Sequence, residues 1–187
     1  GKRRGYYPTR RLLWHAEIIA GNDPAARRLD AAMAQLRDAT GETVIAGRLQ
    51  DDAVVYVAAV EGVHNIRYST VPGEIKPLHS SAIGKALLSG FDNLAEYVAT
   101  LQLKRYTENT LCDPAALLDD LRNGCERGYF TTVGENVSEV MALACRTTIA
   151  GDPIGLAVAG PVTRIRAAES AIAQALRATA AEFEQLT

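Results

Sequence analysis

Helical and strand-like patterns follow one another in blocks along this chain of 187 residues, and the order of the blocks restricts its possible folds. Apolar spacing and β-branched runs predict helices, three strands, helices, three more strands and a final helix. The predicted helices cover residues 8–20, 24–40, 81–90, 93–101, 114–127 and 163–186, and the predicted strands cover residues 43–49, 53–60, 63–71, 129–132, 142–149 and 154–159. Because helices and strands do not alternate strictly, we predict an α+β fold with a mostly antiparallel sheet of five or six strands and helices packed on it.

Capping residues mark the ends of two of these helices. Asp23 and Asp113 each precede a proline, which combines an N-cap oxygen with a ring that fits the first helical turn. Gly41 and Gly128 follow the last helical positions of the same two segments. Glycine at that position can adopt the left-handed conformation that ends a helix, so these boundaries are predicted from local sequence alone.

Basic residues are concentrated at the N-terminus, although the net charge of the chain is only −2. Residues 1–16 contain five Lys or Arg residues and no acid, so the rest of the chain, with 15 basic and 22 acidic residues, carries −7. A free-standing nucleic-acid-binding domain is usually basic, and the acidic body does not fit that class. The basic arm is either a solvated tail or the end of a segment that contacts phosphate.

The cysteines and the hydropathy indicate a reducing compartment. Cys112, Cys125 and Cys145 form an odd set without a C-x-x-C motif, which fits neither a disulfide framework nor a zinc ribbon. No apolar run approaches the ~20 residues of a membrane helix, and no secretory signal opens the chain. We expect a cytoplasmic protein without a membrane partner, in which Cys145 is a core residue.

No arrangement of catalytic or metal-binding residues stands out. The chain lacks a G-x-S-x-G nucleophile elbow and a His-Glu-x-x-His metal motif. Gly84-Lys85 does not belong to a phosphate-binding P-loop, because the glycine required five positions earlier is His79. We predict no cofactor and no metal site. One alternative from the enzyme class stays open, a small hydrolase or isomerase built on His79, Ser80 and Ser81.

A candidate binding site lies where residues 78–83 lead into a predicted helix. The amides of Ala82 and Ile83 fall in the first helical turn, where backbone N–H groups have no partner within the helix. They point out of the end at which the helix dipole favours an anion, and the two serines before them add hydroxyl donors. Gly84 is predicted to permit close packing on the sheet. This arrangement suits a carboxylate.

At this loop the chain resembles the IclR family of bacterial transcriptional regulators, specifically their effector-binding domain. The segment PLHSSAIGKALL (residues 77–88) follows the family's loop nearly throughout. The resemblance spans about residue 23 to the end, and it implies a GAF-like fold. Supporting matches are Thr107 and Thr110 with Leu111, Arg127-Gly128-Tyr129, Gly134-Glu135, and Gly160-Pro161 followed by Arg164.

The resemblance also implies a division of the chain and of a longer protein. Residues 1–22 are expected to be the end of a wing and a linker helix from a missing N-terminal winged helix-turn-helix, and residues 23–187 the effector-binding domain. Operator DNA would be bound through the missing domain and not through this segment. A homodimer or tetramer is expected from the family.

The family's effector pocket lies between the sheet and the loop at residues 78–84. Its best-known polar wall has a carboxylate, a cysteine and two serines at positions that hold Thr132, Ala142, Ala157 and Ala159 in this chain. Each lost partner would leave a polar group of a small keto acid unpaired, at about 1–3 kcal/mol. The resemblance therefore implies a larger, more apolar effector.

Our hypothesis is an effector with one acid group, such as an aromatic or hydroxylated aromatic acid, whose carboxylate binds at Ala82 and Ile83. The complete predicted effector-binding set is Tyr68, Leu78, Ser80, Ser81, Ala82, Ile83, Gly84, Thr132, Glu135, Val140, Ala142, Ala157 and Ala159. A further alternative is a GAF-like interaction module without a ligand.

Overall fold

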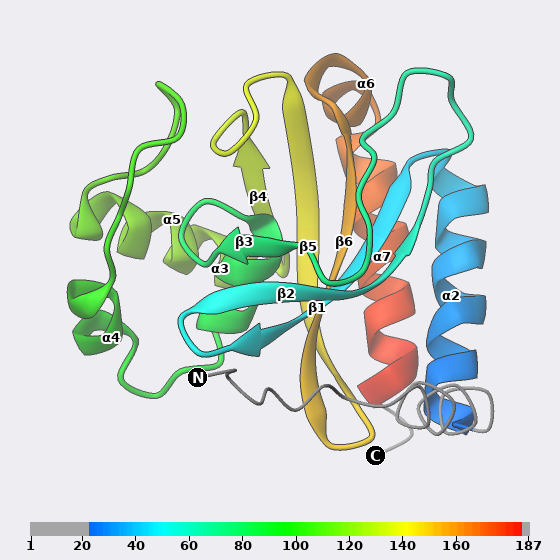
Figure 1. The fold of residues 1–187 in the computed structure, drawn as a ribbon, viewed down its shortest axis with the longest axis horizontal. Coiled ribbons are helices and arrows are strands. Elements are labelled where there is room, and N and C mark those ends of the chain that lie inside the picture. Colours follow the sequence, from blue (N-terminus) through cyan, green and yellow to red (C-terminus); the bar gives the residue numbers. More distant parts are fainter. Residues whose placement is uncertain (1–22, 185–187) are drawn as a thin grey trace, which may run out of the picture.

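A six-stranded antiparallel sheet forms the centre of the computed structural model, which describes residues 23–184 (Figure 1). The strands are β1 (Thr43–Gln50), β2 (Ala53–Val60), β3 (Ile75–Pro77), β4 (Phe130–Val133), β5 (Val140–Ile149) and β6 (Asp152–Pro161). Their order is β3-β2-β1-β6-β5-β4, and every neighbouring pair is antiparallel. The predicted α+β class and the antiparallel sheet are therefore confirmed.

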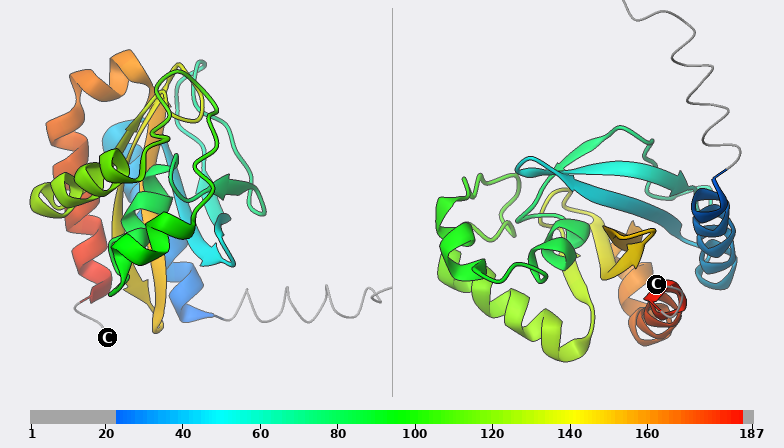
Figure 2. Two further views of the ribbon diagram at one scale, coloured as in Figure 1. Left: turned by 90° about the vertical axis from the view of Figure 1, so that its left-hand side faces the viewer. Right: turned by 90° about the horizontal axis from the view of Figure 1, so that it is seen from below.

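Helices cover both faces of this sheet (Figures 1 and 2). One face carries α2 (Pro24–Thr40) and α7 (Glu169–Glu184), which pack on each other and on the strands. The other face carries α3 (Ala82–Leu88), with α5 (Pro114–Arg127) packed on α3 and on β4, and α4 (Leu94–Thr100) packed on α5. The short helix α6 (Val162–Ala167) follows β6.

Each face has its own apolar core, and β6 contributes to both. Leu156 and Val158 pack with the buried residues of α2 and α7. Ala157 and Ala159 pack in the second core, with α3. This division follows from the pleat, because successive residues of a strand face opposite sides of the sheet. The face of β6 that lies beneath α3 therefore carries small side chains.

The predicted caps form as expected. The Asp23 side chain accepts a hydrogen bond from the amide of Ala25, and the Asp113 side chain accepts from two amides at the start of α5. Gly41 and Gly128 both adopt the left-handed conformation, with φ of 72° and 77°. None of the helices in residues 23–184 has the length and hydropathy that crossing a membrane requires.

Residues 63–71, predicted as a third strand, form a loop instead, and the third strand is Ile75–Pro77. The reason lies in hydrogen bonds made by distant side chains. The Thr43 hydroxyl donates to the carbonyl of Tyr68 at 2.5 Å, and the Arg164 guanidinium donates to the carbonyl of Ile66 at 3.0 Å. These carbonyls are thus paired without a neighbouring strand, and the β-branched run could not reveal that.

The predicted C-terminal helix is two helices, α6 and α7, separated by Ala168. The change of direction lets Arg164 in α6 pair with the buried carboxylate of Glu42 while α7 packs along β5. The other predicted elements agree with the structure to within about two residues at most ends. The helix predicted at residues 8–20 lies outside the described residues.

Cys145 is buried in β5, as predicted, whereas Cys125 is exposed. Burial raises the pKa of the Cys145 thiol to about 12, so it is protonated at neutral pH and unreactive. We expect a thiol reagent to modify Cys125 rapidly and Cys145 only after unfolding, as measured by mass spectrometry of digested protein. The Cys125→Ser variant should lose the fast phase. Modification of native Cys145 at the rate of Cys125 would contradict this expectation.

Candidate ligand-binding site

The loop before α3 is held against the helix by its own residues. Ser81 has extended backbone dihedrals, and its hydroxyl accepts a hydrogen bond from the amide of Gly84 at 3.0 Å, so it is the N-cap of α3. A Cβ built on Gly84 would lie 2.2 Å from the carbonyl oxygen of Leu78. Gly84 thus permits the close approach of the loop, and its role in packing on the sheet stays a prediction. On the sheet side, Gly155 of β6 makes room for Ile83.

A buried ion cluster fixes the far side of α3. The Nζ atom of Lys85, which is fully buried, lies 2.7 Å from a carboxylate oxygen of Asp120 in α5 and 2.7 Å from one of Glu135. It also donates to the carbonyl of Thr131 at 3.2 Å. Burial raises the pKa of Glu135, and the Lys85 ammonium opposes that rise. The cluster joins α3, α5 and the turn after β4.

The turn that follows β4 is held by the threonine segment noted in the sequence. The Thr107 hydroxyl donates to the carbonyl of Gly134 at 2.6 Å, and the Thr110 hydroxyl donates to that of Glu135 at 2.7 Å. With the side chain of Glu135 paired to Lys85, this turn is fixed from two sides. Its next residue, Asn136, donates from its side-chain amide to the hydroxyl of Ser80 at 3.2 Å.

A small space, which we call the inner cavity, lies between this loop and the sheet. It occupies about 40 Å³. Its lining residues are Ile45, Tyr56, Tyr68, Lys76, Ser80, Ser81, Ala82, Ile83, Thr132, Asn136, Val137, Val140, Ala142, Ala157 and Ala159. In the floor, Ala142 of β5 is paired with Thr132 of β4 on one side and with Ala159 of β6 on the other. Small side chains in adjacent strands leave the space open.

Most of the predicted effector-binding residues line the inner cavity, and three do not. Leu78 lines a neighbouring cleft, Gly84 lies against the loop, and Glu135 pairs with Lys85. Glu135 lies outside the lining because its carboxylate is drawn to the buried ammonium. The resemblance had placed it by its position in the acidic turn, which gives no side-chain direction.

The residues that the sequence did not predict are Ile45, Tyr56, Lys76, Asn136 and Val137. Tyr56 is buried, and burial together with the neighbouring Tyr68 hydroxyl raises its pKa. Burial tends to lower the pKa of Lys76, but its hydrogen bonds to Glu74 and Tyr68 raise it overall. Asn136 and Val137 directly follow the predicted acidic turn, so a wider window there would have included them.

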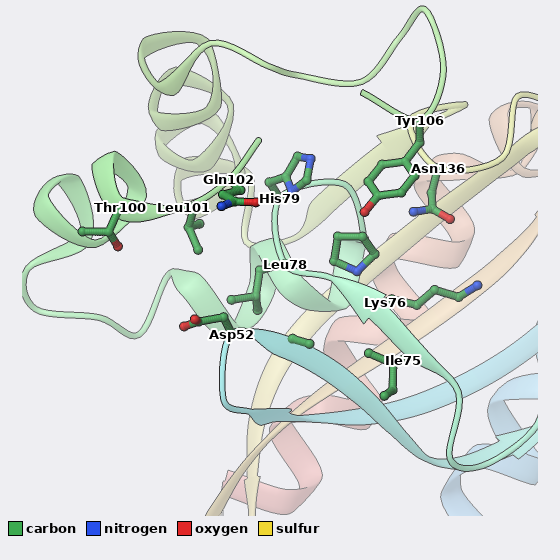
Figure 3. Close-up of a pocket in the computed structure, with 12 residues that line it drawn as sticks. Asp52, Ile75, Lys76, Leu78, His79, Thr100, Leu101, Gln102, Tyr106 and Asn136 are labelled. Atoms are coloured by element: carbon green, nitrogen blue, oxygen red, sulfur yellow. The ribbon is translucent and has the colours of Figure 1, made fainter. Parts of the chain in front are cut away.

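A larger, open cleft of about 610 Å³, the outer cleft, lies beside the inner cavity (Figure 3). It is lined by Asp52, Ala53, Ile75, Lys76, Pro77, Leu78, His79, Thr100, Leu101, Gln102, Tyr106 and Asn136. Lys76 and Asn136 line both spaces, so together they form the partition between them.

The three residues of the catalytic alternative are each engaged elsewhere. The Nε2 atom of His79 lies 2.9 Å from the carbonyl oxygen of Lys104, and burial lowers the pKa of this histidine. Ser80 accepts from Asn136, and Ser81 caps α3. Within residues 23–184 no hydrogen bond joins His79 to either serine, as a base and nucleophile would require. The same residues hold no group of three or more His, Cys, Asp or Glu side chains placed for a metal ion.

An α+β domain with a cavity covered by residues 80–83 at the start of α3 is of the class found at the C-terminal end of certain bacterial transcriptional regulators. Residues 21–185 match the family model described as bacterial transcriptional regulator IclR C-terminal. The chain belongs to the IclR family, as the resemblance indicated.

Relatives of known name agree with this assignment. The chain is 33% identical over 174 residues to the HTH-type transcriptional regulator BhcR of Paracoccus denitrificans, covering 90% of this chain and 62% of that protein. It is 31% identical over 163 residues to the HTH-type transcriptional regulator KdgR of Escherichia coli, covering 86% and 60%. The chain thus spans about three fifths of these relatives. They are transcriptional regulators rather than enzymes, which sets the hydrolase or isomerase alternative aside.

Solved structures share the fold. The IclR of Thermotoga maritima superposes with a TM-score of 0.83 at 23% identity, covering 96% of this chain and 75% of that chain. The C-terminal domain of Escherichia coli KdgR gives 0.75 at 26% identity, covering 86% and 96%. An IclR homologue from Microbacterium hydrocarbonoxydans, crystallised with 4-hydroxybenzoate, gives 0.78 at 21% identity, covering 93% and 72%.

Proposed function

We propose that this chain is the effector-sensing part of a transcriptional regulator and that it binds a small organic acid in the inner cavity. The observation that carries the proposal is the position of this cavity, between a floor of alanines and the first turn of α3. Apolar surroundings with a few convergent polar groups are typical of small-molecule sites. The 4-hydroxybenzoate complex of a fold neighbour supports an aromatic acid as one candidate.

The roof of the cavity offers hydrogen-bond donors to an acid. Ala82 and Ile83 line the cavity at the start of α3, where amides have no acceptor within the helix. The hydroxyl of Ser80 accepts from Asn136, and its own hydrogen is free to donate to a ligand. We infer that the acid group of the effector is held by these donors, and that the alanine floor contacts its apolar part.

The size of the cavity sets a condition on the ligand. About 40 Å³ is room for a few water molecules, since each needs roughly 10–15 Å³, and it is too small for a benzene ring. An aromatic acid therefore requires one wall to move. The partition formed by Lys76 and Asn136 is the wall whose displacement would join the inner cavity to the outer cleft.

Sensing requires the two states of the regulator to bind the acid differently. Movement of Asn136 would pull on the turn after β4, which the Glu135–Lys85 pair ties to α3. We propose that this shift biases a homodimer or tetramer between arrangements with different operator affinity. Operator DNA would be bound in the cytoplasm through a winged helix-turn-helix to which residues 1–22 lead, and not through residues 23–187.

The small volume of the inner cavity favours one other function, a GAF-like interaction module without a ligand. In that case the space would hold only ordered water, and no metabolite would stabilise the domain. The two functions therefore differ in a measurable quantity, the ligand-dependent shift of the melting temperature.

A thermal-shift panel of benzoate, 4-hydroxybenzoate, pyruvate and glyoxylate separates these functions. We expect the aromatic acids to raise Tm, because a ligand at about 100 times its Kd adds about 2.7 kcal/mol to the free energy of unfolding. The Ala142→Leu variant, which fills the floor, should lose the shift, whereas Ala178→Leu on the exposed face of α7 should keep it. Shifts with pyruvate or glyoxylate alone would refute the aromatic acid, and no shift with any acid would favour the module without a ligand.

A further inference from the structure

Three of the polar side chains that line the inner cavity come from β2, β3 and the loop between them. They are Tyr56 of β2, Lys76 of β3 and Tyr68 in the loop. Strands β5 and β6 contribute only Val140 and alanines to the lining. The polar groups that this chain lacks on β5 and β6 thus have a counterpart on β2, β3 and the loop between them.

Among the described residues 23–184, Lys76 is the one charged residue that lines the inner cavity, and none of their acidic side chains lines it. Its side chain is 14% exposed, and its Nζ atom lies 6.0 Å from the centre of the Tyr56 ring. A half-buried ammonium faces little competing water, so it interacts strongly with an anion that reaches it.

The ammonium of Lys76 already has a carboxylate partner from its own chain. The Nζ atom lies 2.5 Å from a carboxylate oxygen of Glu74, whose other oxygen accepts from the Thr70 hydroxyl. Glu74 lines neither the inner cavity nor the outer cleft, and its side chain is 36% exposed. It can therefore leave Lys76 for water without burying an unpaired charge.

The position of Lys76 also gives a ligand access to it. Lys76 lines the outer cleft as well as the inner cavity, and Figure 3 shows its side chain extending from β3 on the side of the cleft where Asn136 lies. A ligand in the outer cleft would reach the ammonium without crossing the apolar floor.

We infer that Lys76 is the cationic group that selects acids as effectors, and that the Glu74 carboxylate occupies it until the acid of the ligand displaces it. The ligand class is a monocarboxylic acid with an apolar body, whose one carboxylate would lie between Lys76 and the first turn of α3, since both line the same small cavity. Tyr56 and Tyr68 line it beside Lys76 and could hydrogen-bond the same group. This inference rests on the proposed function and adds the group that discriminates a carboxylate from a neutral analogue. Glu74 then acts as an internal competitor that sets the affinity.

The test compares benzoate and 4-hydroxybenzoate with their uncharged analogues, benzamide and 4-hydroxybenzamide, by calorimetry. A hydrogen bond to a charged group corresponds to roughly 10- to 150-fold in affinity, so Lys76→Met should weaken binding of the acids by about that factor. The amides should bind the wild type weakly and be unaffected by the substitution. Lys76→Arg should retain most of the affinity for the acids, because it keeps the charge.

Two more variants complete the test. Glu74→Gln removes the competing charge and should tighten acid binding about threefold to tenfold, a modest gain because the Glu74 carboxylate is 36% exposed and partly solvated in the pair. Lys104→Met is the matched control, because Lys104 is a cation near Tyr106 that lines neither space, and it should bind acids like the wild type.

Each outcome decides between the proposals. Equal acid affinity in the wild type and Lys76→Met would overturn the inference and leave the proposed function intact. Unchanged or weaker binding by Glu74→Gln would overturn the role of Glu74 as competitor. If neither acid binds the wild type, the proposed aromatic acid effector itself fails, and Lys76 loses its assigned ligand.

Discussion

The Lys85→Met variant is expected to lose about 3–5 kcal/mol of its free energy of unfolding. Lys85 is fully buried, and its ammonium is the shared counter-ion of the Asp120 and Glu135 carboxylates, both at 2.7 Å. Methionine has a similar shape but no charge, so two carboxylates would face each other across an apolar side chain. The Oε2 atom of Glu135 is already buried without a hydrogen-bond partner, so this carboxylate depends on its contact with Lys85. Urea denaturation followed by circular dichroism measures the loss.

Two controls separate the missing charge from the altered packing. Adding Asp120→Asn and Glu135→Gln to Lys85→Met removes the uncompensated carboxylates and should recover much of the stability. Arg122→Met breaks an exposed ion pair with Asp119 on the same helix as Asp120 and should cost less than about 1 kcal/mol. A loss from Lys85→Met as small as that of Arg122→Met would show that the cluster does not hold α3 in place.

Gly84→Ala should cost roughly 3 kcal/mol, because the added methyl group has no space. It would lie 2.2 Å from the carbonyl oxygen of Leu78, and a backbone atom cannot move away as a flexible side chain can. The loop from Leu78 to Ser81 must shift, so acid binding in the inner cavity should be lost as well. Thermal unfolding and the acid-dependent shift of Tm measure the two effects.

Gly90→Ala is the matched control for this steric effect. The three atoms nearest to its added methyl group all belong to the guanidinium of Arg146, the closest at 2.7 Å, and that group is the end of a flexible side chain. We expect a change within about 1 kcal/mol and unaltered acid binding. If Gly84→Ala is no more destabilising than Gly90→Ala, the close approach of α3 and the loop is not needed for the fold.

The parts of the fold that depend on local sequence were predictable. Asp23 and Asp113 cap helices because an aspartate before a proline offers an acceptor to the following amides, and this needs no tertiary context. Residues 63–71 were not predictable, because their conformation depends on Thr43 and Arg164, which come from other parts of the chain. Strand propensity carries no information about such partners.

The candidate site was predictable in part. The roof at residues 80–83 and the alanines of β5 and β6 followed from the family resemblance. Tyr56 and Lys76 did not, since neither belongs to the motif and β3 is too short to show a pattern. The direction of the Glu135 side chain could not be predicted either, because it depends on the buried ammonium of Lys85, 50 residues away in sequence.

Strand β6 serves two cores with alternate residues, and this has a consequence for how the domain can change. Exchanges at Ala157 or Ala159 alter the space open to a ligand, whereas Leu156 and Val158 hold the layer of α2 and α7 on the other face. Changes on opposite faces of one strand share few contacts, so their effects on stability should be nearly additive. Ligand preference and thermal stability can therefore change independently of each other as this sequence evolves.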